Sequence, residues 1–352
     1  MQAVRFAYLP VWVLQIFSGA KSFRANRLIG SRLLNRLGLH VARKVLAHAV
    51  TGARRAALSP LVPAGLRREF QAAGYIKIEN FLPLDVFDAV CAEADALLSA
   101  SDQQSQEGDT VTRLALIDDE AAALSPGLKR FAGDRRMLNL SNYVGARLKL
   151  PFCYIQSIRR DFTANDSDPQ KDAHSDTFFP TLKGWLFLDE VDADRAPFHY
   201  SPGSHRLTWA RLAWEYRTSL KARSSENPHV ADGSFRPGAD DLRAMGLPDP
   251  APIVAAANTL VLADTVGFHR RGEAKDGRTR RAIYIWMRAN PYNPVPGFRL
   301  RAWRKMELAI TKARRAKAIQ KPQETLFSIS CSNNLTLCFS GEIPGCEGQA
   351  PS

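Results

Sequence analysis

The chain has 352 residues, of which 45% are hydrophobic and 24% charged, a globular composition that excludes disorder throughout. Five cysteines without zinc-finger spacing exclude a disulfide scaffold and favour a reducing compartment. The net charge is +13, but residues 1–68 hold twelve Lys and Arg and no acid, and residues 299–321 hold nine against Glu307 alone. The positive charge therefore lies in two terminal segments beside a mildly acidic body.

Residues 1–65 are predicted to form a basic, amphipathic helical extension. The uncharged run Phe6–Ala20 would rise roughly 22 Å as a helix, short of the roughly 30 Å of a bilayer core, so we expect no spanning helix. Ser18–Ala20 is similar to a signal-peptide cleavage site, but dense positive charge follows it and favours retention on the cytoplasmic side. We therefore expect a cytoplasmic protein, with a peripheral position on the inner face of the membrane as a further expectation.

Basic side chains recur every four residues in this extension, at Arg32, Arg36, His40, Lys44 and His48. An apolar face lies beside them, formed by Leu33, Leu34, Leu37, Val41 and Val45. The stripe fits a solvated face of a packed helix, a helix in a membrane interface with Tyr8, Trp12 and Phe17 as anchors, or a phosphate-backbone contact. The acid-free stretch favours an anionic membrane surface as partner, through residues 1–60 and 299–321. No specific nucleic acid is expected.

The body, residues 66–300, is predicted to be mainly β with flanking helices. Five short apolar or alternating segments separated by turns are the expected strands: CYIQSIRRDF, GWLFLDEV, FHYSPGSH, NTLVLAD and RAIYIWMR. So many strands without long helices between them predict an antiparallel jelly roll, interrupted by an excursion at about 208–250. A basic helix is expected over 301–322 and an irregular tail over 323–352.

Three separated pieces of this body carry candidate chemistry. On a strand, side chains two apart share a face, so His174 and Asp176 can converge on one ion. His269, predicted to end the NTLVLAD strand before a turn, is a third candidate ligand. Two His and one carboxylate form the facial triad of non-haem Fe(II) oxygenases. Arg280 enters an apolar strand, where a buried guanidinium needs an anionic partner such as a carboxylate.

Four strings, two of which contain these residues, resemble the phytanoyl-CoA dioxygenase family of Fe(II)/2-oxoglutarate oxygenases, over about residues 69–288. They are GYIKIENFLPLDVFDAV, AHSDTFFP, KGWLFLDEVDADRAPFHYSPGSHR and ADTVGFHRRGEAKDGRTRRAIYIW. The family's metal ligands fall on His174, Asp176 and His269. Its 2-oxoglutarate-binding Arg falls on Arg280, eleven positions after the last of these.

The resemblance implies a double-stranded β-helix, the jelly roll of cupins. It also implies Fe(II) as cofactor and 2-oxoglutarate and O₂ as co-substrates, with C–H hydroxylation accompanied by succinate and CO₂. By the same analogy Thr177 and Gln156 hydrogen-bond the co-substrate. Asp176 stands where the family's halogenases carry a small residue, which favours hydroxylation. With the basic extension, this predicts a hydroxylase of a lipid-like or amphiphilic substrate.

Two alternatives remain at this point: a soluble hydroxylase of a small metabolite, and a non-catalytic basic binding protein. Several conspicuous residues have weaker claims to the site. His205 lies in a Pro-Gly turn and is interpreted as structural, whereas His199 fits a structural or a pocket position equally. Strand alternation places Arg281 on the face opposite Arg280. Lys183 and Trp185 either line the site or flank a strand.

Overall fold

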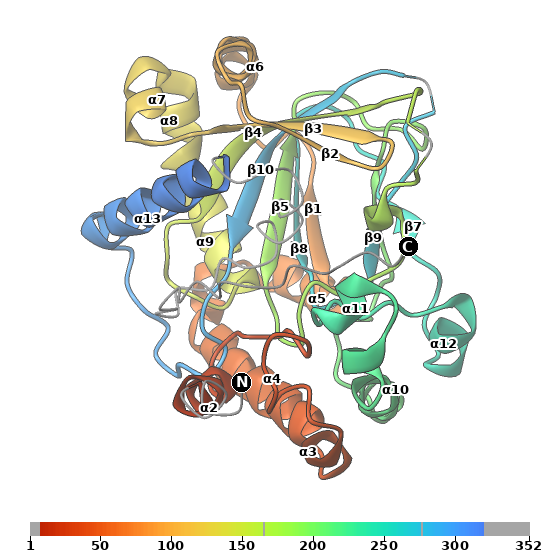
Figure 1. Ribbon diagram of the computed structural model, residues 1–352. Coiled ribbons are helices and arrows are strands. Elements are labelled where there is room, and N and C mark those ends of the chain that lie inside the picture. Colours follow the sequence, from red (N-terminus) through yellow and green to blue (C-terminus); the bar gives the residue numbers. More distant parts are fainter. Residues whose placement is uncertain (1–7, 165, 276, 320–352) are drawn as a thin grey trace.

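The computed structural model describes residues 8–319 except 165 and 276, and it consists of two antiparallel sheets with flanking helices (Figure 1). The large sheet has the order β1-β8-β5-β10-β4-β3-β2 and the small one β7-β6-β9. The strands are β1 (Tyr75–Ile78), β2 (Gln104–Glu107), β3 (Thr110–Leu116), β4 (Phe152–Arg160), β5 (Leu182–Phe187), β6 (Phe198–Tyr200), β7 (Ala251–Pro252), β8 (Thr259–Asp264), β9 (His269–Arg271) and β10 (Arg280–Met287). This confirms the predicted fold class, a mainly antiparallel jelly roll with flanking helices, and all five expected strands.

Alternation along β5 shows how the large sheet divides the core. Leu182 and Leu186 face the helices α5 (Ala64–Ala73), α6 (Leu84–Ser99), α8 (Pro126–Ala132) and α9 (Arg135–Val144), within the main apolar cluster. Trp185 and Phe187 face the other way, into a second cluster with Phe198 of β6. The site is built on this second face, between the two sheets. β8 consists of six buried residues and lies between β1 and β5 in the large sheet, whose middle strand is β10.

The remaining helices lie outside the sheets. They are α2 (Leu9–Ile16), α3 (Arg32–Arg36), α4 (Leu39–Ala57), α7 (Asp119–Leu124), α10 (Trp209–Ser219), α11 (Pro228–Ala231), α12 (Ala239–Ala244) and α13 (Arg301–Ile319), with short 3₁₀ turns at Ser59–Leu61, Pro169–Lys171 and Ala222–Ser224. α10, α11 and α12 supply the helical patches expected in the 208–250 excursion. α13 is the expected basic helix as far as Ile319, and the tail at 323–352 lies outside the described residues. No helix in the described part of the chain is long and apolar enough to cross a bilayer.

The N-terminal helices correct one prediction. The basic stripe of α4 faces inward: His40 and Lys44 are buried and contact Glu215 of α10, at 2.7 Å and 2.9 Å. Beside them, Arg43 donates to the main-chain carbonyls of Ile16, Ser18 and Ala20. These cations are therefore neither a solvated face nor a phosphate-binding one. The physical reason is Glu215, whose buried carboxylate requires cationic neighbours. The predicted domain boundary at residue 65 stays a prediction.

Candidate metal centre

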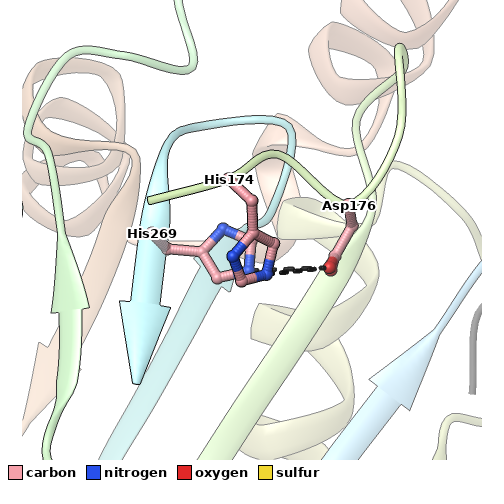
Figure 2. Close-up of side chains that lie close together, drawn as sticks. All are labelled: His174, Asp176 and His269. Atoms are coloured by element: carbon pink, nitrogen blue, oxygen red, sulfur yellow. Dashed lines mark ion pairs between the residues drawn. The ribbon is translucent and has the colours of Figure 1, made fainter. Parts of the chain in front are cut away.

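His174, Asp176 and His269 converge between the two sheets, and all three are buried (Figure 2). Oδ1 of Asp176 lies 3.8 Å from Nε2 of His174 and 3.6 Å from Nε2 of His269. One ligand atom from each residue lies within 4.8 Å of the others. Neither Nε2 has a hydrogen-bond partner, an arrangement that buried polar atoms otherwise avoid. Two imidazoles and one carboxylate at this spacing can hold a single divalent cation.

Backbone pairing positions the three side chains. His174 and His269 form an antiparallel bridge with two N–H···O bonds of 2.9 Å, and the N–H of Asp176 donates to the carbonyl of Thr265 at 3.0 Å. Two details differ from the sequence prediction. His174 and Asp176 lie on an extended segment outside the named strands, because only His174 pairs in ladder fashion. His269 begins β9 instead of ending β8, because the turn containing Gly267 precedes it.

Each imidazole is fixed in the tautomer that a metal requires. Nδ1 of His174 lies 2.8 Å from the carbonyl of Asp172, and Nδ1 of His269 lies 2.9 Å from the carbonyl of Gly267. A carbonyl only accepts, so each Nδ1 carries the proton and each Nε2 keeps a free lone pair toward the centre. Burial, aided by the neighbouring His269, holds the pKa of His174 well below its usual value, so this ring is neutral at physiological pH.

Two lysines hold Asp176. Burial alone would raise the pKa of the Asp176 carboxyl, but the Lys183 ammonium and the neighbouring imidazoles lower it well below its usual value. Lys183 Nζ donates to Oδ1 at 2.9 Å, and the buried Lys21 donates to the main-chain carbonyl of Asp176 at 2.8 Å. The sequence left open whether Lys183 lines the site or only flanks a strand, and its contact with Asp176 shows that it lines the site. Lys21 was missed, since no pattern reveals a partner 155 residues away.

Arg280 begins β10 and is buried, with Nη1 donating to the carbonyl of Ala196. Its guanidinium lies 5.8 Å from the ring of Phe187, and among the described residues no carboxylate pairs with it. Burial, together with the neighbouring Arg271, lowers the pKa of Arg280 to about 9. A buried guanidinium without a carboxylate partner is stabilised by an anion that binds beside it. Arg281 points the other way and pairs with Asp189 and Asp95, which confirms the predicted alternation.

One face of β5 connects the triad with Arg280. Lys183 contacts Asp176, Trp185 follows on the same face, and Phe187 lies against Arg280. Alternate residues of a strand are about 7 Å apart, so the strand places the two ends of this row about 13 Å apart. The candidate metal site and the buried Arg280 therefore lie along one interior surface.

The two secondary candidates make other contacts. Nε1 of Trp185 donates to Oε1 of Gln156 at 3.2 Å, which places Gln156 on the same interior face. Thr177 donates its hydroxyl to the carbonyl of Phe179, so only its lone pairs remain for a ligand. Their contact with a co-substrate stays a prediction. His205 packs against Phe70 and Nδ1 of His199 contacts the carbonyl of Pro250, so neither joins the triad.

The arrangement defines a non-haem metal oxygenase site on a jelly roll. Residues 70–236 match the model of the Phytanoyl-CoA dioxygenase (PhyH) family. The match confirms the resemblance seen in the motifs, and with it the class of Fe(II)- and 2-oxoglutarate-dependent oxygenases. It includes His174 and Asp176 but ends before His269 and Arg280, which the fold brings to the same surface. None of the curated proteins compared matches the chain significantly.

Solved structures of similar outline are distant. The epimerase SnoN, in complex with Fe3+, alpha ketoglutarate and nogalamycin RO, is 18% identical, with 66% of this chain and 84% of that one covered and a TM-score of 0.44. HygX from Streptomyces hygroscopicus, with nickel and 2-oxoglutarate bound, is 16% identical; 64% of this chain and 86% of that one are covered, with a TM-score of 0.43. A Pseudomonas putida prolyl-4-hydroxylase is 15% identical; 64% of this chain and 97% of that one are covered, with a TM-score of 0.41. Likeness at this level assigns no activity to the chain.

Proposed function

We propose that this protein is an Fe(II)- and 2-oxoglutarate-dependent hydroxylase of a lipid-like or amphiphilic substrate. One observation supports this most strongly: two imidazoles with unpartnered Nε2 atoms and one carboxylate converge on the interior surface that also holds the buried Arg280, which has no carboxylate partner among the described residues. The residues fit both groups, with three ligands for Fe(II) and one guanidinium for the distal carboxylate of 2-oxoglutarate.

The protein's own residues divide the work between them. His174, Asp176 and His269 would hold Fe(II) through the two Nε2 atoms and the carboxylate. Lys183 keeps Asp176 ionised, and Arg280 orients the co-substrate through a bidentate carboxylate contact. Bound Fe(II) supplies the activation of O₂. In the overall reaction one oxygen atom enters a C–H bond as hydroxyl and the other enters succinate, with release of CO₂.

Asp176 favours hydroxylation over halogenation, because its carboxylate would bind Fe(II) in the place of a halide. The lipid-like substrate class is supported by the apolar residues that the N-terminal helices expose and by the contact of Lys21, from the same region, with the carbonyl of Asp176. A soluble small metabolite is the alternative substrate within the same chemistry.

The test is turnover of 2-oxoglutarate to succinate with Fe(II) and O₂, screened over lipid and small-metabolite pools for products heavier by one oxygen atom. We expect oxygen incorporation in the lipid pool and none with Asp176→Ala. Asp172→Ala is the matched control, since that exposed side chain lies four residues earlier and contributes only its main-chain carbonyl. Turnover retained by Asp176→Ala would contradict the enzymatic proposal, and oxygen incorporated only into small metabolites would contradict the lipid one.

A further inference from the structure

The N-terminal helices turn apolar side chains toward solvent. On α2 and directly after it, Leu14 is 69% exposed and Phe17 62%. On α3 and directly after it, Leu33 is 65% exposed and Leu37 77%. Leu9 and Val13 of α2, and Val45 and Leu46 of α4, are also exposed. α2, α3 and α4 lie together at the end of the molecule opposite α6 and α7 (Figure 1).

The exposure of Val45 and Leu46 follows from the inverted polarity of α4. An ordinary surface helix buries its apolar face and turns its charges to water. Here the buried face is polar: His40 and Lys44 are paired with Glu215, and Arg43 donates to three carbonyls that follow α2 or end it. The apolar side chains are consequently left outside. A patch of this kind marks an interaction site on a soluble protein.

The charges around the patch identify its partner. Arg32 and Arg36 are exposed and alternate along α3 with Leu33 and Leu37. The first acid of the chain is Glu69, so no carboxylate on these helices balances the arginines. A second copy would bring the same arginines face to face, because symmetric contacts pair identical surfaces. An anionic lipid surface instead accepts leucines in the acyl boundary and arginines among the headgroups.

We propose that α2, α3 and the first half of α4 form an interfacial membrane-binding surface for an anionic bilayer. Leu14, Phe17, Leu33 and Leu37 enter the acyl boundary, and Arg32 and Arg36 contact headgroup phosphates. Tyr8 and Trp12, whose rings stack at 6.4 Å, add half-buried amphipathic aromatic side chains on α2 and directly before it. This binding mode differs from the one predicted from the sequence, in which the whole basic stripe would face the membrane.

The surface is also connected to the metal centre. Lys21, between α2 and α3, donates to the carbonyl of Asp176, and the Arg43 guanidinium stacks 4.3 Å from the ring of Phe178. The N-terminal region that carries the lipid-facing side chains is therefore in direct contact with the segment that carries two metal ligands. An enzyme held in this way would meet an amphiphilic substrate at the bilayer.

Co-sedimentation with vesicles tests the surface without iron or 2-oxoglutarate, so its outcome is independent of catalysis. We compare the full chain with Leu14→Ser/Phe17→Ser/Leu37→Ser on phosphatidylglycerol and on pure phosphatidylcholine vesicles. The matched control is Leu84→Ser/Phe162→Ser/Leu124→Ser, whose side chains are 71%, 62% and 82% exposed elsewhere on the molecule. All six positions are exposed, so folding should persist, and circular dichroism checks it.

We expect the wild type to bind anionic vesicles and the patch variant to lose at least about tenfold in partition coefficient, with the control unchanged. Arg32→Gln and Arg36→Gln should each weaken binding to anionic vesicles by about fivefold and leave binding to neutral vesicles unchanged. Three results would overturn the proposal: no binding by the wild type, equal loss in patch variant and control, or a wild-type dimer in light scattering that the patch variant dissociates.

Discussion

Arg280 and Arg281 are adjacent residues with opposite environments. Arg280 is buried beside Phe187, and among the described residues no carboxylate accompanies it. Arg281 forms ion pairs with Asp189 and Asp95 on the outer face of the sheet. Strand alternation produces this difference. Arg281 can therefore serve as the control for substitutions of Arg280.

Arg280→Gln should raise the KM for 2-oxoglutarate by about 100-fold, because it removes a charge-assisted bidentate contact. The kcat at saturating co-substrate should fall less. Steady-state succinate formation measures both constants. Arg281→Gln should leave the KM for 2-oxoglutarate unchanged, and equal effects of the two variants would refute the assignment of Arg280.

The buried His205 should make the stability of the protein depend on pH. Burial, followed by the nearby Arg55 and Arg206, lowers the pKa of His205 to about 3. Between about pH 6.5 and pH 3 the unfolded chain binds a proton at this residue that the native protein does not, so stability falls with falling pH. His205→Phe, which keeps the ring against Phe70, should recover about 2 kcal/mol of the stability lost between pH 7 and pH 4.5. Urea unfolding at the two pH values measures it, and an unchanged difference would contradict the prediction.

At the scale of the element, α4 is held by a buried ionic cluster. Glu215 of α10 contacts His40, Lys44 and Arg211, and all four side chains are almost fully buried. Burial alone would raise the pKa of Glu215, but Lys44 and Arg211 hold it well below its usual value. Removing residues 1–60 would take away His40 and Lys44 and leave Glu215 with Arg211 alone of these three cations, so point variants are the appropriate probes of this region.

Glu215→Gln should destabilise the protein by about 3 kcal/mol, because it leaves Lys44 and Arg211 buried without their counter-charge. Chemical denaturation measures the change. The control is Glu226→Gln, an exposed acid in the same excursion, which should change stability by less than about 0.5 kcal/mol. If Glu215→Gln also lowered the free energy of unfolding by less than about 0.5 kcal/mol, the cluster would not be what holds α4.

The contrast between β8 and α4 shows how far the sequence could predict the fold. β8 was predictable because its apolar run is long enough for a buried strand. Its neighbours β1 and β5 can likewise be predicted from their own apolar or alternating patterns. α4 was misjudged because its orientation depends on Glu215, which lies 175 residues beyond His40. The triad was identified by motif and spacing, whereas Lys21 was not, since its acceptor is a main-chain carbonyl.

At the scale of the whole molecule, the metal centre joins segments that are distant in the chain. His174 and Asp176 lie on the segment before β5, and His269 begins β9. A bound ion would therefore stabilise the native state by mass action. Addition of Fe(II) or Mn(II) to chelator-treated protein should raise the Tm by about 2–5 °C, and His269→Ala should abolish that shift. A shift of equal size in His269→Ala would place the ion elsewhere.

The most direct test of the account is anaerobic binding of Fe(II) and 2-oxoglutarate. A 2-oxo acid chelated to Fe(II) gives a visible charge-transfer absorption that neither component gives alone. We predict this band for the wild type, its loss in His269→Ala, and its recovery only at higher 2-oxoglutarate in Arg280→Gln. A folded wild type without the band, or a His269→Ala variant that keeps it unchanged, would contradict the assignment of the metal centre.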